Sequence, residues 1–287
     1  ELVLAEKGDP GVPFTWLCFG SEGRREQTLH TDQDNGILFE AKDAAQAAEI
    51  RQRLLPIAQQ INIHLAACGF TLCKGNIMAG NPDLCLSRAE WARRFAAFIR
   101  EATPENLLAS SIYFDLRVVW GDEQGCQQLR RSVLEQVADN RLFQRMMADN
   151  ALRHRPPVGR FREFVLERKG GDKATLDLKI QGLTPFVDGA RLLALANGVY
   201  ANNTLERLRQ LITLGVIEPL DGAAYEEAYH FIQQTRMQQH QLQTRENRPY
   251  SNRVDPDQLN QLDRRILREA LRQAQRLQSS LALRYQL

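Results

Sequence analysis

Strand signals are confined to the first part of this 287-residue chain, and helical periodicity takes over after residue 85. Short apolar runs at residues 14–19 and 37–39 predict two buried strands, and residues 70–78 predict a third. Residues 43–67 carry apolar side chains at helical spacing, with Pro56 inside the stretch. These patterns predict a small α/β unit at the beginning of the chain.

The remainder of the sequence is typical of a helical bundle. Ser87 precedes a stretch that ends at Arg100, and Glu90 follows it by three residues, which is the spacing of a capping box. We predict fold class α+β, with a small head at residues 1–84 and a mainly α-helical bundle at residues 85–287. A wider interpretation extends the head to about residue 122. The later stretches with helical periodicity are residues 104–120, 125–150, 152–169, 185–201, 204–214, 221–244 and 257–285.

Charge and composition exclude several classes of protein. The formal net charge is only +2, so a broad nucleic-acid-binding surface is not expected. No apolar run approaches the ~18–20 residues of a membrane-spanning helix, so no membrane segment is expected. The five cysteines form no cluster with zinc-site spacing, which favours buried free thiols and a cytoplasmic protein. Because the chain begins at Glu1, we expect further sequence before it.

Residues 19–35 carry the pattern that points to chemistry, Phe-Gly-Ser-Glu-Gly-Arg-Arg-Glu-Gln-Thr-Leu-His-Thr-Asp-Gln-Asp-Asn. A turn at Gly20 and Ser21 after a strand lets backbone N–H groups and a hydroxyl approach a phosphate. Asp32 and Asp34 stand two residues apart, so on a strand they point to the same face. Paired carboxylates suit divalent cations such as Mg²⁺. A phosphate turn with a metal site is what phosphoryl or nucleotidyl transfer requires.

This arrangement of Gly-Ser, a ten-residue spacer and Asp-x-Asp resembles the signature of the DNA polymerase β-like nucleotidyltransferase superfamily. Within it, the chain is similar to a bacterial nucleotidyltransferase family that is often joined to upstream CBS or cyclic-nucleotide-binding domains. That family is related to the protein-PII uridylyltransferase and the glutamine-synthetase adenylyltransferase. Residues 74–82, 111–117 and 175–179 are similar to later blocks of the family.

The resemblance implies a polymerase β-like head whose activity depends on Mg²⁺, with two ions and Mn²⁺ as an alternative. The reaction would move UMP or AMP from an NTP to an acceptor hydroxyl, most plausibly on a protein, as in bacterial signal transduction. Gly20 and Ser21 match the phosphate turn, Asp32 and Asp34 match the metal-binding catalytic pair, and Arg24 matches an arginine that contacts the triphosphate or supports the loop. Sensory domains would precede Glu1. No His-Asp dipeptide occurs, so a second phosphohydrolase activity is not expected.

Two positions depart from the superfamily pattern. Gln33 is polar where an apolar residue usually separates the two aspartates. The third carboxylate usually comes from a later strand, yet residues 70–78 contain no acid. Asp115 is the first candidate for this third catalytic carboxylate, and Asp83 is the second. Further candidates for nucleotide binding are Lys74, Asn76 and Lys179.

Structural roles remain open for most of these residues. The aspartate pair could cap a helix or a turn, Arg24 could pair with Glu22 or Glu26, and Asp115 could pair with Arg117. His30 is better explained as a structural histidine than as a general base. The arginines between residues 153 and 168 could form a solvated face or contact a ligand.

Two other functions also remain open. The chain could be a nucleotide-sensing interaction module that binds Mg-NTP without transfer. It could also be a scaffold for a homodimer, built on the leucine stripe of residues 257–285, although a stripe of this kind more often packs within its own chain.

Overall fold

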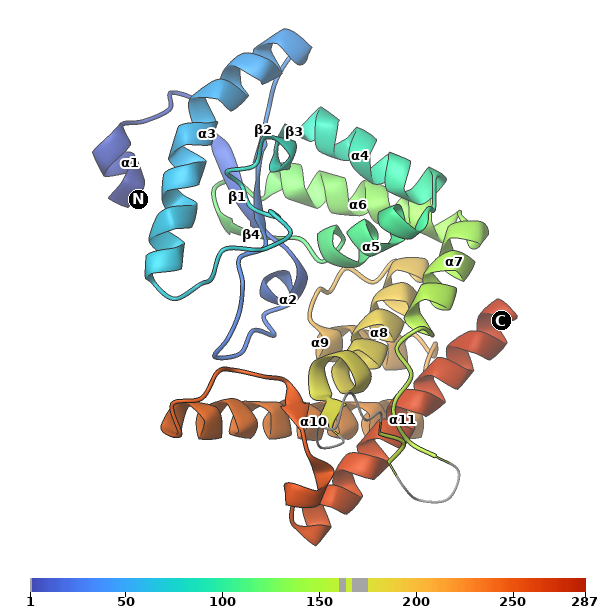
Figure 1. Ribbon diagram of the computed structural model, residues 1–287. Helices are drawn as coiled ribbons and strands as arrows, with labels where there is room; N and C mark the ends of the chain where they lie inside the picture. Colours follow the sequence, from blue (N-terminus) through green and yellow to red (C-terminus); the bar gives the residue numbers. More distant parts are fainter. Residues whose placement is uncertain (1, 160–163, 167–174) are drawn as a thin grey trace. The chain divides into compact units, whose positions relative to one another are not determined.

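The computed structural model describes residues 2–159, 164–166 and 175–287, and it divides the chain into two compact units, Glu1–Asn140 and Arg141–Leu287 (Figure 1). The boundary expected at residue 84 falls inside the first unit, because β3 (Cys85–Ser87) and β4 (Arg117–Trp120) complete its sheet. The wider limit near residue 122 also falls short, since α6 (Gln124–Ala138) packs against α4 (Arg88–Arg100) and β2 of the same unit.

The sheet of the first unit is mixed and has the order β3-β2-β1-β4. β1 (Phe14–Cys18) runs antiparallel to both β2 (Asn35–Phe39) and β4, whereas β3 is parallel to β2. Every residue of β1 and β2 is buried, because helices cover both faces of the sheet. This explains why the two strands were recognisable as continuous apolar runs.

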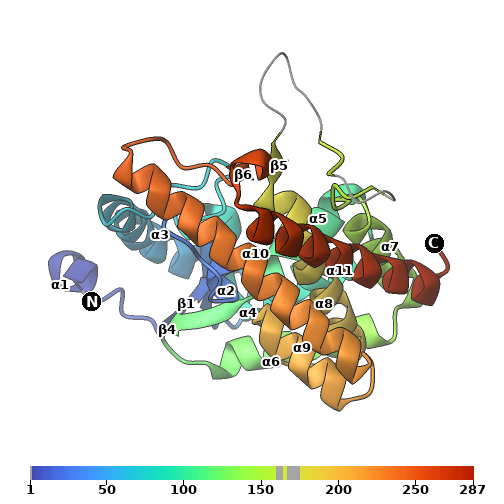
Figure 2. The same ribbon diagram turned by 90° about the horizontal axis from the view of Figure 1, so that it is seen from below.

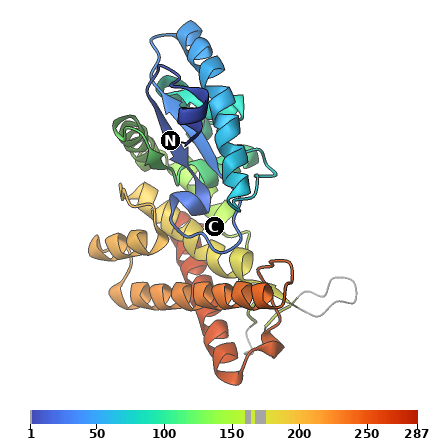
Figure 3. The same ribbon diagram turned by 90° about the vertical axis from the view of Figure 1, so that its left-hand side faces the viewer.

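The two faces have separate helical covers (Figures 1 and 3). α3 (Ala44–Ala67), which coincides with the predicted helix over residues 43–67, packs on the face that carries Trp16 and Ile37. On the opposite face the Phe19 ring lies 5.7 Å from the ring of Trp91 in α4. The N-terminal α1 (Leu2–Lys7) also contacts α3.

Two local predictions for the first unit are wrong. Residues 70–78 form no strand, and their only bridge joins Thr71 to Asp32. The stretch 104–120 is not one helix, because α5 (Pro104–Tyr113) ends before β4. The β-branched pair at the centre of β4 favours pairing with β1 over helix. The capping box predicted at the start of α4 is confirmed, with Ser87 and Glu90 bonding each other's backbone.

The second unit is mainly helical, which confirms the α+β class of the whole chain (Figure 2). α8 is buried around most of its circumference and packs against α7, α9 and α11, while the two longest helices, α10 and α11, pack against each other. β5 and β6 pair antiparallel. None of the described helices is long and apolar enough to cross a membrane. The bounds are α7 (Arg141–Ala151), β5 (Leu176–Asp177), the π-helix η2 (Leu178–Leu183), α8 (Thr184–Ala196), α9 (Thr204–Thr213), α10 (Pro219–Arg245), β6 (Arg253–Val254), the 3₁₀ helix η3 (Pro256–Gln258) and α11 (Gln261–Tyr285).

The helices predicted after residue 122 are found, with two exceptions. The stretch 125–150 forms two helices, α6 and α7, because the boundary between the two units falls inside it. In the predicted helix over residues 152–169, the described residues 152–159 and 164–166 are non-helical, and the rest lie outside the described residues. Pro156 and Pro157 account for the break, because proline has no backbone N–H to donate and fixes its own φ. Of the predicted stripe, Ala270, Leu277 and Leu281 are buried in α11, whereas Leu262 and Ile266 are exposed.

Candidate active site

The loop between β1 and β2 begins with the short helix α2 (Gly20–Gly23), and two of its residues must be glycine. Gly20 has a φ of +54°, and a Cβ there would lie 3.1 Å from Oδ2 of Asp34. A Cβ on Gly23 would lie 1.7 Å from the carbonyl oxygen of Asp115, which is a direct clash with backbone. The Gly-Ser-Glu-Gly pattern is therefore dictated by close packing of the loop against Asp34 and the segment before β4.

Asp32 and Asp34 lie together at the end of this loop, as the sequence predicts. The backbone N–H of Phe19 donates to the carbonyl of Asp34 at 2.8 Å, which ties the start of the loop to its end. One carboxylate oxygen of each aspartate and the Sγ of Cys73 lie within 4.8 Å of one another. Asp32 is exposed, and Asp34 and Cys73 are half-buried. The group could hold a divalent cation and leave room for a ligand.

Cys73 was not foreseen as part of the site. The expectation of buried free thiols is confirmed for Cys18, Cys85 and Cys126 but is wrong for Cys73, which is half-buried, and for Cys68, which is exposed. All five thiols are free. The single bridge of Thr71 to Asp32 is what brings Cys73 next to the aspartates, and nothing in the cysteine spacing reveals that bridge.

A buried polar network holds the aspartate segment from below. The side-chain amide of Gln33 donates to the carbonyls of Asn62 and Phe70, both at 2.9 Å. Asn62 in turn donates to the side-chain oxygens of Gln33 at 2.8 Å and of Asn35 at 2.9 Å. Asn35 also accepts the backbone N–H of Ala79 at 2.8 Å. An apolar residue in place of Gln33 could not make these bonds, which explains its departure from the superfamily pattern.

Arg24 is held between two carboxylates, Glu26 at 2.7 Å and Asp115 at 2.6 Å. Burial lowers the pKa of Arg24, but the charges of Asp115 and Glu26 raise it by more. Asp115 is completely buried and is not a member of the group formed by Asp32, Asp34 and Cys73. The geometry therefore makes Asp115 the partner of Arg24 and gives it no place at the metal-ligating cluster.

Glu22, an acidic residue inside the loop, was not predicted to be part of the site. Its side chain is half-buried, and its carbonyl accepts a bond from the guanidinium of Arg117 at 3.1 Å. Burial, opposed by Arg117 and reinforced by Asp34, raises the pKa of Glu22 to about 7. Arg24 pairs with Glu26, so the charges that act on Glu22 are those of Arg117 and, more weakly, Asp34. The position of Glu22 within the Gly-Ser-Glu-Gly motif was the sequence feature that could have pointed to it.

Other predicted residues take different places. Ser21 is half-buried, and its carbonyl accepts the N–H of Glu26 at 2.9 Å. Lys74 and Asn76 are exposed in the turn that follows Cys73. Lys179 belongs to the second unit, where it is exposed in η2. Two acidic or basic side chains named in the sequence analysis, Asp83 in the 3₁₀ helix η1 (Pro82–Leu84) and His30, are exposed and outside the ligand group.

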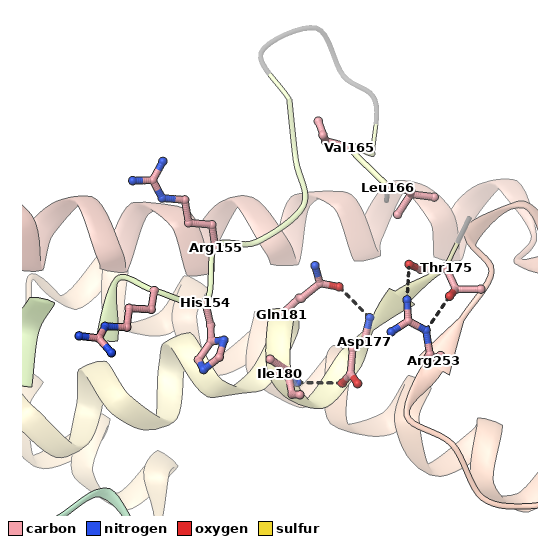
Figure 4. Close-up of a pocket in the computed structure, with 10 residues that line it drawn as sticks. His154, Arg155, Val165, Leu166, Thr175, Asp177, Ile180, Gln181 and Arg253 are labelled. Carbon is pink, nitrogen blue, oxygen red and sulfur yellow. Dashed lines mark hydrogen bonds between the residues drawn. The ribbon is translucent and has the colours of Figure 1, made fainter. Parts of the chain in front are cut away.

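The second unit contains a separate cavity of about 350 Å³ (Figure 4). Among the described residues of its lining, Arg153, Arg155 and Arg253 carry guanidinium groups, His154 adds an imidazole and Asp177 is the acid. Arg253 donates to the hydroxyl of Thr175 at 2.8 Å, and Asp177 accepts backbone N–H groups at the start of η2. The cavity therefore joins the family block at residues 175–179 to two arginines of the predicted basic run. Arg160, Arg162 and Arg168 of that run lie outside the described residues.

Comparisons with known families agree with this division of the chain. Residues 1–105 match a family model described as "Putative nucleotidyltransferase DUF294". Residues 141–285 match one described as "Putative nucleotidyltransferase substrate binding domain". No curated protein matches the sequence closely enough to count as a relative. The second match begins at the first residue of the second unit. The chain belongs to the nucleotidyltransferase family that these two models describe.

Proposed function

We propose that this protein transfers a nucleoside monophosphate, UMP or AMP, from a nucleoside triphosphate to a hydroxyl group on an acceptor protein, in a reaction that depends on Mg²⁺. Family membership supports the reaction class. The finer proposal rests on one observation, which is that Asp32 and Asp34 present their carboxylates together beside the Gly-Ser turn. The five free thiols support a reducing, cytoplasmic setting.

The donor atoms fit a divalent cation. Carboxylate oxygens are the ligands that Mg²⁺ prefers, and Asp32 is exposed, so water or phosphate oxygens have access. We propose two Mg²⁺ ions, with Mn²⁺ as an alternative, held by Asp32 and Asp34. Bound there, such ions supply charge stabilisation to the attacking and leaving oxygens of an in-line displacement.

The loop residues would bind and orient the triphosphate. Any Cβ at Gly20 would point at the Asp34 carboxylate, so the bare backbone leaves space for a phosphate next to the aspartates. Ser21 would add a hydroxyl donor, and Lys74 and Asn76 would offset the charge of the departing pyrophosphate. We propose Arg24 and Asp115 as positioning residues, because their buried ion pair fixes the loop from beneath.

The second unit would recognise the acceptor. The description of its family supports a substrate-binding role, and the described lining of its cavity carries three arginines and one aspartate. We propose that this cavity and the exposed Lys179 contact an acidic segment of the acceptor. The variant Arg153→Ala/Arg155→Ala should raise the KM for the acceptor and leave NTP binding unchanged.

The test is a transfer assay with the purified chain, Mg²⁺, each of the four α-labelled NTPs in turn, and lysate of the source organism. We expect one base to label a protein band, and Asp32→Asn/Asp34→Asn to abolish that labelling. Asp139→Asn removes an exposed carboxylate in the same unit and is the matched control. Equal labelling by the wild type and the double variant would refute the assignment.

Binding of Mg-NTP without transfer is the alternative function. The burial of Asp115 against Arg24 favours it, because the ligand group among the described residues contains no third carboxylate. Calorimetric binding of Mg-NTP with no release of pyrophosphate, over lysates that contain many acceptors, would support the sensing module over the transferase.

A further inference from the structure

We propose that Asp32, Asp34 and Cys73 form a three-ligand site that takes a thiophilic divalent cation of the zinc class in preference to Mg²⁺. This inference deepens the proposed function, and it rests on that function only for the role of the two aspartates. On binding, the thiol would release its proton to solvent, and one ion would be coordinated by a thiolate and two carboxylates.

Backbone pairing explains why Cys73 reaches the aspartates. Asp32 and Thr71 form a parallel bridge, in which Gln33 donates to the carbonyl of Thr71 at 2.9 Å. Two residues after Thr71, the Sγ of Cys73 lies within 4.8 Å of a carboxylate oxygen of Asp32 and of Asp34. The bridge at Asp32 therefore brings the segment that carries the thiol next to the two carboxylates.

A tight turn then holds the backbone of Cys73 in place. The N–H of Asn76 donates to the carbonyl of Cys73 at 3.0 Å, and Asn76 has a φ of +55°. The carbonyl of Ile77 accepts the N–H of Asn35 at 3.1 Å, which ties the turn to β2. The backbone of Cys73 is thus held beside the aspartate segment by the turn that follows it.

The distances suit a single ion with little movement. The three ligand atoms lie within 4.8 Å of one another, so a single point between them is at most about 2.8 Å from each, and shifts of a few tenths of an ångström would bring all three to bonding distance. Zinc–sulfur and zinc–oxygen bonds are about 2.0–2.3 Å long. Asp32 is exposed and the other two ligands are half-buried, so further coordination positions remain open to water or phosphate.

Ligand chemistry decides which ion the group prefers. Mg²⁺ demands oxygen ligands in octahedral geometry, whereas thiolate selects softer ions such as Zn²⁺ and Cd²⁺. A group of two carboxylates and one thiol therefore favours an ion of the zinc class.

Cd²⁺ titration of the full chain tests the site, because a cadmium–thiolate bond has an ultraviolet charge-transfer band that carboxylates lack. We expect the wild type to show the band at one equivalent of Cd²⁺. Cys73→Ser should lose the band and bind Cd²⁺ about tenfold more weakly or worse, since even outer-shell losses cost about 10–100-fold in affinity. Calorimetry should give both proteins the same Mg²⁺ affinity. Cys68→Ser is the matched control, because Cys68 is an exposed thiol at the end of α3.

Alkylation gives a second measurement. Burial raises the pKa of Cys18, Cys85 and Cys126 to about 12, so these thiols should react slowly, and Cys68 and Cys73 should take most of the label. Equimolar Zn²⁺ should protect Cys73 and leave Cys68 reactive. Mass spectrometry of the digested protein separates the two positions.

The outcomes separate this inference from the proposed function. If Cys73→Ser retains the band and the Cd²⁺ affinity, or if Cys68→Ser removes them, the three-ligand site is wrong. If the band requires Cys73 and no NTP is ever transferred, the metal site stands and the transferase proposal fails. Loss of Cd²⁺ binding in Asp32→Asn/Asp34→Asn completes the assignment of the ligands, and unchanged binding in that variant would overturn it.

Discussion

Gln33 is only 1% exposed, although its neighbour Asp32 is exposed and its neighbour Asp34 is half-buried. Its amide holds the carbonyls of Asn62 and Phe70, so replacement by leucine would leave buried acceptors without donors. We expect Gln33→Leu to lower the free energy of unfolding by about 1–3 kcal/mol, as measured by urea denaturation. Gln52→Leu, on the exposed surface of α3, is the control. Equal stability of Gln33→Leu and wild type would show that the network does not hold the site.

Glu22 should make stability depend on pH in a specific window. Its pKa is raised from 4.5 to about 7 in the folded protein, whereas the unfolded chain ionises near the ordinary value. The folded state therefore binds the extra proton between these values, and the stability it contributes is present below pH 4.5 and lost as pH rises to about 7.

Glu22→Gln removes this titration. In metal-free buffer, the variant should gain stability relative to wild type as pH rises through that window, by about 1–3 kcal/mol, since one pKa unit is worth about 1.4 kcal/mol. Urea denaturation at pH 4 and pH 8 measures the difference, and Glu49→Gln, an exposed acid in α3, controls for general charge effects. A difference that stays constant with pH would contradict the raised pKa.

At the scale of elements, α2 is positioned by contact between backbones. Gly23 leaves no room for a side chain, because its Cβ would overlap the carbonyl of Asp115. We expect Gly23→Ala to push α2 away from the segment before β4 and to cost about 1–3 kcal/mol or more. Thermal unfolding measures the loss. Gly75→Ala, where a Cβ would make only ordinary contacts at 3.7 Å and beyond, should change stability by less than about 0.5 kcal/mol.

Elements with a single dominant signal could be predicted from sequence. β1 and β2 are buried on both faces and read as apolar runs, and the capping box marks the start of α4. The division of the chain could not be predicted, because β3 and β4 are short edge strands of three and four residues. Their place in the sheet depends on pairing with distant residues, which local pattern does not report.

In the candidate site, too, the features set by local sequence could be predicted and those set by distant pairing could not. Asp32 and Asp34 stand two residues apart in the chain, so their common face follows from strand geometry alone. Cys73 joins them through one bridge at Thr71, and Asp115 leaves the candidate set because Arg24 binds it across ninety-one positions of sequence. Both facts depend on tertiary pairing. The side chain that a residue contacts in the folded protein is therefore a better guide to its role than its residue type alone.

For the whole molecule, the division into two units determines how the chain should unfold. Each unit has its own core, with Leu17, Ile37 and Phe95 buried in the first and Leu192, Leu271 and Ile232 in the second. We therefore expect residues 1–140 and residues 141–287, expressed separately, to unfold cooperatively as independent domains.

A divalent cation should stabilise only the fragment of residues 1–140, because Asp32, Asp34 and Cys73 all belong to it. An ion at a hundredfold excess over its Kd adds about 2.7 kcal/mol to a folded state that binds it. Differential scanning calorimetry with Cd²⁺ should thus raise the Tm of residues 1–140 and leave that of residues 141–287 unchanged. The first fragment carrying Cys73→Ser should lose most of the shift. A comparable rise in both fragments would mean that the ion binds carboxylates non-specifically, since the second fragment contains no cysteine but many acidic residues.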